Sequence, residues 1–310
     1  MKHKGRIIAG AALVLACGLA ALIFYLRSPV LLVSDEPFTL IYGSRRAKIR
    51  QLTASLAAGR RVKQVMIADS AGTDLLVLAL EEADPRPWCV VFPYRYAAGA
   101  RRFHEQNPEI HTILLYGCAE QGDGRPVVAS DSGSTGLFFE FYTDRRLDLY
   151  RTGRFAAILS GEKTGILPVF INKLDSNAGK DAFLQGFGSN TPELEPRFYD
   201  SYAALTISDD FPLVVIAGSG MEYFDKNPKS PLILFTWLDP ALASSETLVI
   251  MDDSIWAQLI PALHMVKKGR KSGLIPSKPL IFLTRVADKD ILRQLRKAAG
   301  SDIMPNTEQP

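Results

Sequence analysis

Polar and aromatic residues that follow short apolar runs are the ones whose chemistry could serve a site in this chain. They are Ser44, Arg45, Asp69, Ser70, Tyr94, Tyr116, Asp131, Asn172, Asp175, Trp237, Asp239, Asp252 and Asp253. Aromatic rings stack on the face of a sugar or a base, and carboxylates and amides accept hydrogen bonds from hydroxyl groups. Each residue also has a plain structural role open to it, since an Asp can cap a helix or form a turn and a Trp can belong to the core. The set therefore predicts a surface that binds a small polar molecule.

Catalytic motifs are incomplete in this sequence. Residues 131–136, DSGSTG, match the Asp-Ser/Thr-Gly-Ser/Thr pattern of aspartic peptidases, but that chemistry needs a second such carboxylate and the chain has no second copy. The same residues resemble a phosphate-binding turn, and they also suit a flexible turn between two lobes. Residues 160–164, SGEKT, fail the spacing of a P-loop. We therefore expect no enzymatic activity.

Metal and cofactor sites are not expected either. The chain has 3 cysteines (Cys17, Cys89 and Cys118) and 4 histidines, and none of them has metal-ligand spacing. The 36 basic residues nearly balance the 33 acidic ones, and no basic stripe indicates a nucleic-acid partner.

The N-terminus predicts a membrane anchor. Residues 7–26 are uncharged and mostly apolar, and at ~1.5 Å per residue they span about 30 Å, the thickness of a bilayer core. Lys2, Lys4 and Arg6 precede this run, which places the N-terminus in the cytoplasm and the body outside the cytoplasmic membrane. A cleaved signal peptide and a lipoprotein signal, with Cys17 as the lipidated residue, are the alternatives.

Apolar runs and helical patterns alternate through the body of the chain. Strands are expected at 38–42, 62–67, 88–92, 112–116, 127–129, 165–171, 197–199, 213–217, 232–235, 248–251 and 280–283. Helices are expected around Ile49, Leu52 and Leu56 on one face, and at 142–160, 178–187 and 256–266. Near-continuous apolar strands are buried on both faces, as in parallel sheets covered by helices.

The predicted fold class is α/β, with two doubly wound parallel-sheet lobes after the N-terminal helix. The first lobe is expected to hold 38–136 and part of 250–300, and the second lobe 160–250 and part of 270–300. The last ten residues, 301–310, are expected to form a disordered tail.

This organisation resembles the type I periplasmic binding protein fold, and most closely the basic membrane protein family of nucleoside-binding lipoproteins. The resemblance lies in residues 153–159 followed by 163–167, in 179–187 with its final Gly186-Phe187, and in 247–269. It implies an extracytoplasmic solute-binding protein whose partner is a transporter permease or a membrane signalling protein. The first loop departs from the family, because Gly43-Ser44-Arg45-Arg46 replaces an acidic ligand motif. Nucleoside binding is therefore not carried over.

Ligands of open α/β sheets bind outside the carboxyl ends of the strands, and hinge closure of two lobes buries them. We therefore expect a membrane-anchored solute-binding protein or sensor for a sugar or nucleoside. An envelope interaction protein of the same fold without a ligand is the first alternative, and a hydrolase or nucleotidase is the second.

Overall fold

The computed structural model describes most of the body of the chain. The described residues are 15–19, 21–35, 44–67, 72–116, 136–161, 163–171, 177–188, 194–200, 211–217, 229–235, 246–282, 285–286 and 288–300. By internal contacts the chain divides into two compact units. The first comprises Met1–Leu114, Gly133–Phe139 and Ala262–Lys271, and the second comprises Leu115–Ser132, Glu140–Pro261 and Ser272–Pro310.

The first sheet has six strands in the order β11-β5-β4-β3-β1-β2. Their bounds are β1 Val30–Asp35, β2 Val62–Ile67, β3 Cys89–Pro93, β4 His111–Tyr116, β5 Phe138–Thr143 and β11 Ser272–Ile275. β1 pairs in parallel with β2 and β3, and β5 pairs in parallel with β11. Val30, Leu32, Val90 and Val91 have no exposed surface, which explains their apolar character on both faces of the sheet.

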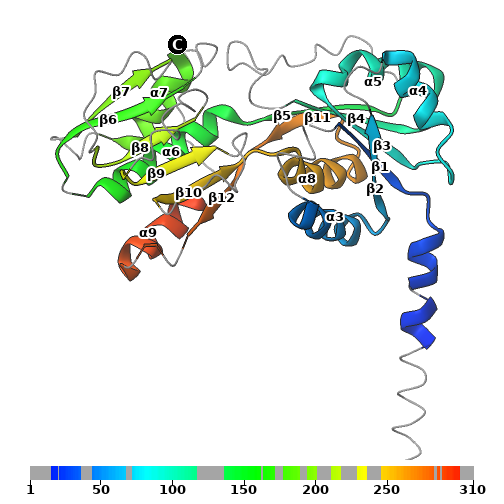
Figure 1. Ribbon diagram of the computed structural model, residues 1–310, viewed down its shortest axis with the longest axis horizontal. Coiled ribbons are helices and arrows are strands. Elements are labelled where there is room, and N and C mark those ends of the chain that lie inside the picture. Colours follow the sequence, from blue (N-terminus) through cyan, green and yellow to red (C-terminus); the bar gives the residue numbers. More distant parts are fainter. Residues whose placement is uncertain are drawn as a thin grey trace, which may run out of the picture. The chain divides into compact units, whose positions relative to one another are not determined.

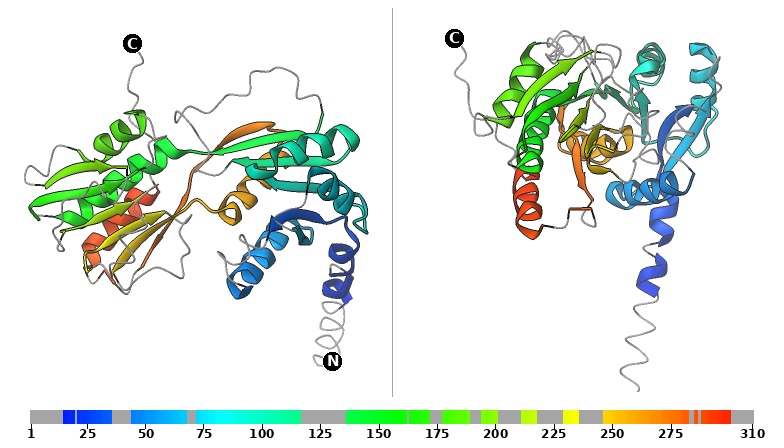
Figure 2. Two further views of the ribbon diagram at one scale, coloured as in Figure 1. Left: turned by 45° about the horizontal axis from the view of Figure 1, so that its top comes forward. Right: turned by 60° about the vertical axis from the view of Figure 1, so that its left-hand side comes forward.

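Helices connect and cover the strands of this sheet. They are α3 Ser44–Ala58, α4 Thr73–Glu81, α5 Ala97–Gln106 with the 3-10 turn η1 Tyr94–Tyr96 before it, and α8 Ile255–Lys267. α4 and α5 lie together on one face of the sheet, and α3 and α8 lie on the other (Figures 1 and 2). Right-handed crossovers on a sheet that reverses its strand order require this two-sided cover.

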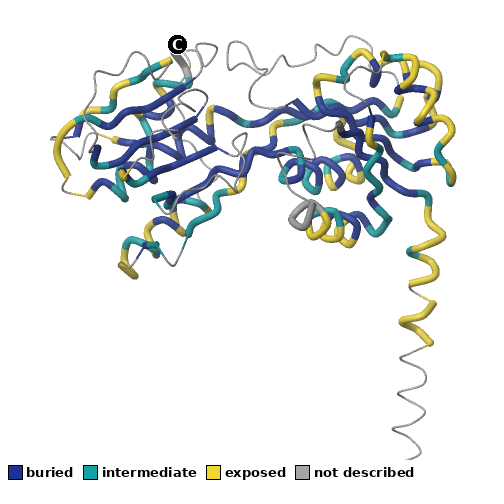
Figure 3. The backbone as a smooth tube through the Cα atoms, viewed as in Figure 1, coloured by how far each residue is buried: buried dark blue, intermediate teal, exposed yellow. Residues whose placement is uncertain are grey.

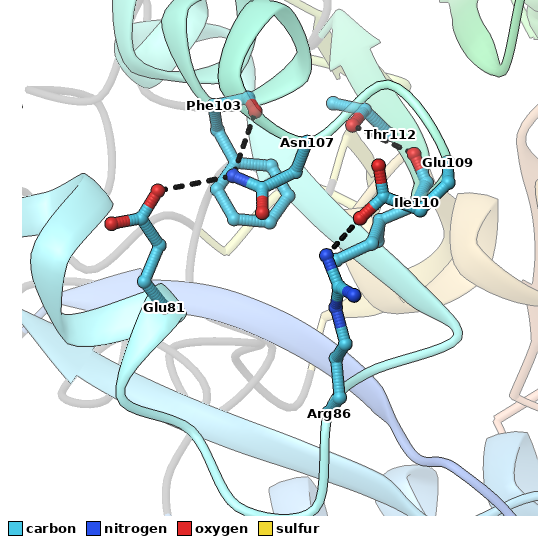
Figure 4. Close-up of polar contacts among 7 residues, drawn as sticks. All are labelled: Glu81, Arg86, Phe103, Asn107, Glu109, Ile110 and Thr112. Atoms are coloured by element: carbon cyan, nitrogen blue, oxygen red, sulfur yellow. Dashed lines mark hydrogen bonds and ion pairs between the residues drawn. The ribbon is translucent and has the colours of Figure 1, made fainter.

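The loops at the amino ends of β3 and β4 are fixed by side chains. Asn107, which ends α5, donates through Nδ2 to Glu81 Oε1 at 3.1 Å and to the Phe103 carbonyl at 3.2 Å (Figure 4). Arg86 and Glu109 form an ion pair beside them. The two loops are therefore tied to α4 and α5 at the edge where the strands begin.

The second sheet also has six strands, in the order β12-β10-β9-β8-β6-β7. Their bounds are β6 Gly165–Phe170, β7 Leu194–Tyr199, β8 Val214–Ile216, β9 Leu232–Phe235, β10 Thr247–Asp252 and β12 Lys278–Ile281. β7, β6, β8, β9 and β10 pair in parallel, and β12 pairs antiparallel with β10. The helices are α6 Arg145–Ser160, α7 Asn177–Phe187 and α9 Lys289–Ala299. Figure 3 shows the inner strands β6, β8, β9 and β10 as largely buried, whereas the edge strands β7 and β12 are mostly not buried.

α6 and α7 approach each other through two glycines. A Cβ atom added at Gly153 would lie 2.1 Å from the Phe183 carbonyl oxygen, and one at Gly186 would lie 1.9 Å from the Tyr150 carbonyl oxygen. Any larger residue would collide with backbone at either position. Both glycines belong to the segments that carry the family resemblance described above, and their role there is helix packing.

The two parallel-sheet lobes predicted from the sequence are confirmed, with one antiparallel edge strand. Three strands were not predicted, namely β1, β5 and β11, while the expected strands 38–42 and 127–129 lie outside the described residues, as does the tail 301–310. Ile49, Leu52 and Leu56 do share one face of α3, but that face is exposed rather than packed on the sheet. Within the described part of the chain, no helix is long and apolar enough to cross a membrane.

Candidate functional site

The carboxyl ends of the second sheet meet at one edge. Phe170 of β6 is in register with Ile216 of β8, and Met251 of β10 is in register with Phe235 of β9. The backbone N–H of Ala217, just past β8, donates to the Phe170 carbonyl at 2.8 Å. The rule that open α/β sheets bind ligands beyond their carboxyl ends makes this edge the candidate site of the second unit.

Arg145 places a guanidinium at this edge. It is the first residue of α6 and only 4% exposed. Its Nη2 donates to the Ala217 carbonyl oxygen, and its Cζ lies 4.1 Å from the centroid of the Phe235 ring. The carbonyl and the aromatic face both stabilise a buried cation. This residue therefore offers a fixed positive charge and fixed N–H donors beside the ends of β8 and β9.

Asp148 lies one helical turn beyond Arg145 and is fully buried. Its Oδ1 accepts a hydrogen bond of 2.8 Å from the backbone N–H of Ser277, and its Oδ2 accepts one from the Ser277 hydroxyl. Burial raises the pKa of Asp148 to about 7, although the bonds from Ser277 and the charge of Arg145 act in the opposite direction. The carboxylate therefore fixes the β11–β12 connection to α6 and changes charge near neutral pH.

Asp252 ends β10, Asp253 follows it, and both are buried. Oδ1 of Asp252 accepts from the Ser254 hydroxyl at 2.6 Å, and the Ser254 hydroxyl accepts from Ala257 N–H at 3.3 Å. Ser254 is thus the residue that caps α8, and Asp252 holds it in place. The Asp253 carbonyl accepts from Gln258 Nε2 at 2.9 Å. The capping side chain is therefore that of Ser254, and the Asp pair supports the turn, Asp252 through its carboxylate and Asp253 through its carbonyl.

Gln258 joins this turn to β5. Its Nε2 also donates to the Thr143 hydroxyl at 2.8 Å, while its buried Oε1 has no hydrogen-bond partner among the residues that the structure describes. A buried amide oxygen without a partner is uncommon in folded proteins. It is an acceptor that a polar ligand or a water molecule could satisfy.

Tyr116 ends β4 of the first sheet, and Tyr94 directly follows β3. The Tyr116 hydroxyl donates to Glu140 Oε1 at 2.9 Å, and its ring stacks on Tyr142 with centroids 4.2 Å apart. The pKa of Tyr116 is raised, mainly by burial of the hydroxyl and secondly by the neighbouring Glu140. Tyr94 is 36% exposed in η1. Of these two predicted ligands, Tyr116 is thus engaged inside the protein and Tyr94 reaches the surface.

The other predicted site residues have no described side chain. Ser44 and Arg45 begin α3, but their side chains lie outside the described residues, and so do Asp69, Ser70, Asp131, Asn172, Asp175, Trp237 and Asp239. Cys17 lies in a short helix over 15–19 and is exposed with a free thiol. The described residues contain no group of three His, Cys, Asp or Glu side chains that could hold a metal ion.

Arg145, Asp148 and Gln258 were not among the predicted site residues. A signal for two of them exists, because Arg145, Asp148 and Arg151 recur every three residues along one side of a helix that also carries core residues such as Leu149 and Phe155. Charged side chains on such a buried helix are costly unless they are paired, so they mark a polar network.

Comparison with solved structures shows the fold. A solute-binding protein of an ABC transporter system from Conexibacter woesei matches with a TM-score of 0.57 and 13% identity, over 88% of this chain and 95% of that chain. A transcriptional activator of the comK gene from Bacillus halodurans matches with a TM-score of 0.54 and 14% identity, over 87% and 95%. A periplasmic solute-binding protein from Actinobacillus succinogenes, solved with bound D-allose, matches with a TM-score of 0.52 and 12% identity, over 84% and 99%.

No protein-family model matches the sequence, and a search of curated proteins finds no match. The chain therefore has a type I periplasmic binding protein-like fold, and its structural neighbours are binding proteins and regulators rather than enzymes.

Proposed function

We propose that this chain is a membrane-anchored, extracytoplasmic solute-binding protein or sensor that closes its two lobes on a small polar ligand of the sugar class. The observation that carries the proposal is Arg145, a buried guanidinium held between the Ala217 carbonyl and the Phe235 ring at the carboxyl edge of the second sheet. Fixed donors beside an aromatic ring suit a hydroxyl-rich ligand. One structural neighbour, solved with D-allose, is consistent with a sugar.

The proposal includes attachment through residues 7–26 with the body outside the cytoplasmic membrane, and a transporter permease or a membrane signalling protein as the partner. A retained anchor, a lipidated Cys17 and a cleaved signal are separable by mass. If the anchor is retained, the mature protein should have the mass of the intact chain. Cys17→Ala should then change that mass only by the substitution itself and should leave the protein in the membrane. Loss of the first 26 residues from the mature protein would instead indicate cleavage. Membership of the basic membrane protein family stays a prediction.

A thermal-shift screen of the full chain in detergent against sugars, nucleosides and amino acids tests ligand binding. Ligand at 100 times its dissociation constant adds about 2.7 kcal/mol to stability, which such a screen detects readily. We expect at least one sugar to stabilise the protein. A blank screen, together with native mass spectra that show no carried-over ligand, would refute ligand binding.

An envelope interaction protein without a ligand is the second candidate. It is favoured by the internal use of two predicted ligand residues, since the Tyr116 hydroxyl is bonded to Glu140 and the Asp252 carboxylate to Ser254. The same screen separates the two functions, because an interaction protein of this kind gives no small-molecule stabilisation.

A further inference from the structure

The end of the N-terminal apolar segment contacts the turn that follows α3. Arg27 Nη1 donates to the Gly59 carbonyl at 3.3 Å, and the Arg61 guanidinium lies 4.1 Å from the centroid of the Tyr25 ring. These contacts lie within the first unit and join the end of the apolar segment to the C-terminal end of α3. The place where the chain leaves its apolar segment is therefore also the place where α3 ends.

α3 exposes its large apolar side chains and buries its small ones. Ile49, Leu52 and Leu56 are 60%, 60% and 68% exposed, whereas Ala54 and Ala58 are 1% and 3% exposed. The spacing of three and four residues puts the three large side chains in one stripe, which we call the α3 stripe. Figure 3 shows exposed residues along α3. A contiguous exposed apolar stripe of this kind marks a surface that contacts something other than water.

Basic residues flank the α3 stripe. Lys267, Lys268, Arg270 and Lys271 are exposed at and just beyond the end of α8. Lys267 Nζ donates to the Ala58 carbonyl at 2.6 Å, so the end of α8, where this basic run begins, contacts the end of α3. Neither residues 44–58 nor residues 267–271 contain an acidic residue. The acidic Glu81 and Glu109, which belong to the loops at the amino ends of β3 and β4, are bonded to Asn107 and Arg86.

We infer that α3 lies in the headgroup region of the anionic bilayer surface from which residues 7–26 emerge, with the α3 stripe in the acyl boundary and residues 267–271 on the phosphates. Interfacial helices bind through an apolar face flanked by Lys and Arg, and basic clusters next to a membrane segment add electrostatic attraction to anionic lipids. Chain continuity selects the bilayer as the occupant, because the apolar segment and α3 end at the same turn. The inference rests on the membrane attachment in the proposed function.

Tryptophan quenching in the full-length protein tests the location of α3. Leu52→Trp and the matched control Leu75→Trp, at a 63% exposed position on α4, are reconstituted in vesicles of phosphatidylcholine and phosphatidylglycerol. Brominated lipid is expected to quench the added emission of Leu52→Trp beyond that of the wild type, and to leave the added emission of Leu75→Trp unquenched. Replacement of Lys267, Lys268, Arg270 and Lys271 by Gln should reduce the quenching at position 52. The same loss is expected in vesicles of phosphatidylcholine alone and at high salt.

The outcomes separate the inference from the proposed function. Equal quenching at positions 52 and 75, or none at position 52 in a protein that resists alkaline extraction from the vesicles, overturns the inference alone. Protein that is released by alkaline extraction overturns the membrane attachment and the inference with it. Unquenched Leu52→Trp together with crosslinking of Leu52→Cys between copies would assign the α3 stripe to a dimer instead, and would also overturn the inference.

Discussion

Replacement of Asp148 by Asn should change how the stability of the protein depends on pH. The carboxylate is fully buried in α6 and accepts two hydrogen bonds from Ser277. Burial raises its pKa from 3.8 to about 7. The folded protein therefore binds a proton at this group, between about pH 4 and pH 7, that the unfolded chain has released.

The sign and the magnitude follow from that difference. A group whose pKa is higher in the folded state contributes stability that is fully present below the unfolded value and is lost as the pH rises through the folded value. The difference between about 7 and 3.8 corresponds to about 4 kcal/mol at ~1.36 kcal/mol for each pH unit. Asn is neutral at every pH and can keep both bonds to Ser277, since its oxygen accepts and its amide donates.

Denaturant unfolding of the full chain at about pH 5 and about pH 8 measures this effect. Of the total of about 4 kcal/mol, about 2.7 kcal/mol is lost between pH 5 and the folded pKa of about 7, so the stability of the Asn variant relative to the wild type should be greater near pH 8 than near pH 5 by about 2.7 kcal/mol. Asp290→Asn, at an exposed position in α9, is the control and should shift neither value by more than about 0.5 kcal/mol. Burial also raises the pKa of Asp144, so part of the slope should persist in the Asn variant. An equal stability difference at both pH values would refute the reasoning.

Three further variants test the packing and the site. Gly186→Ala places a Cβ 1.9 Å from the Tyr150 carbonyl oxygen, where ordinary contact begins at 3.4 Å. It should therefore lower the free energy of unfolding by about 2 kcal/mol, seen as a lower denaturant midpoint. Gly300→Ala, whose added Cβ has its nearest contact at 3.8 Å, should leave the midpoint unchanged. Asp288→Ala removes the side chain that accepts from Asp290 N–H at 2.7 Å and Ile291 N–H at 3.2 Å, and should destabilise α9 by about 1 kcal/mol in the same assay. Arg145→Gln should abolish the thermal shift produced by a stabilising sugar, whereas the exposed Arg293→Gln should retain it; a retained shift in Arg145→Gln would remove Arg145 from the site.

Strands buried on both faces were the easiest part of the fold to predict. β3, β8 and β9 consist of apolar residues that are all buried, and they stand out from the segments around them. The missed strands have different surroundings. β1 follows closely on the apolar segment, and β11 is four residues long, mostly not buried, and bordered by Lys271. Local sequence carries little signal for an edge strand whose pairing partner lies far away in the chain.

The missed strand β5 also explains why Arg145 was not predicted as a site residue. The rule that site residues follow strand ends selected Asp252, Asp253 and Tyr116 correctly as residues at those ends. Arg145 obeys the same rule, because β5 ends at Thr143. Residues 138–143 gave no separate strand prediction, so Arg145 was assigned to the interior of a long helix. One missing element thus removed one residue from the predicted site.

Sequence periodicity shows that side chains share a face but does not show which way that face points. Ile49, Leu52 and Leu56 have the spacing of a core-facing stripe, and yet the small residues Ala54 and Ala58 face the sheet. α3 approaches the start of β2 closely, since Gln51 Nε2 donates to the Val62 carbonyl at 2.7 Å and Val62 N–H donates to the Ser55 hydroxyl at 2.9 Å, and such an approach favours small residues on the inner face. This outcome depends on the distance between helix and sheet, which the sequence of α3 alone does not contain.

The order of strands in the first sheet has a consequence for how the protein is made. β1 to β4 and β5 leave the ribosome early, but β11, which pairs with β5 at the border of that sheet, begins only at Ser272. Until then the backbone N–H and C=O groups along that side of β5 have no strand beside them, and unpaired strand borders promote wrong association between chains. All the strands of the second sheet except β12 precede residue 272, so that sheet can form most of its ladder first. Limited proteolysis of nascent chains stalled before residue 272 would show the first sheet still open, and the N-terminal half of the chain waits for its C-terminal end to finish folding.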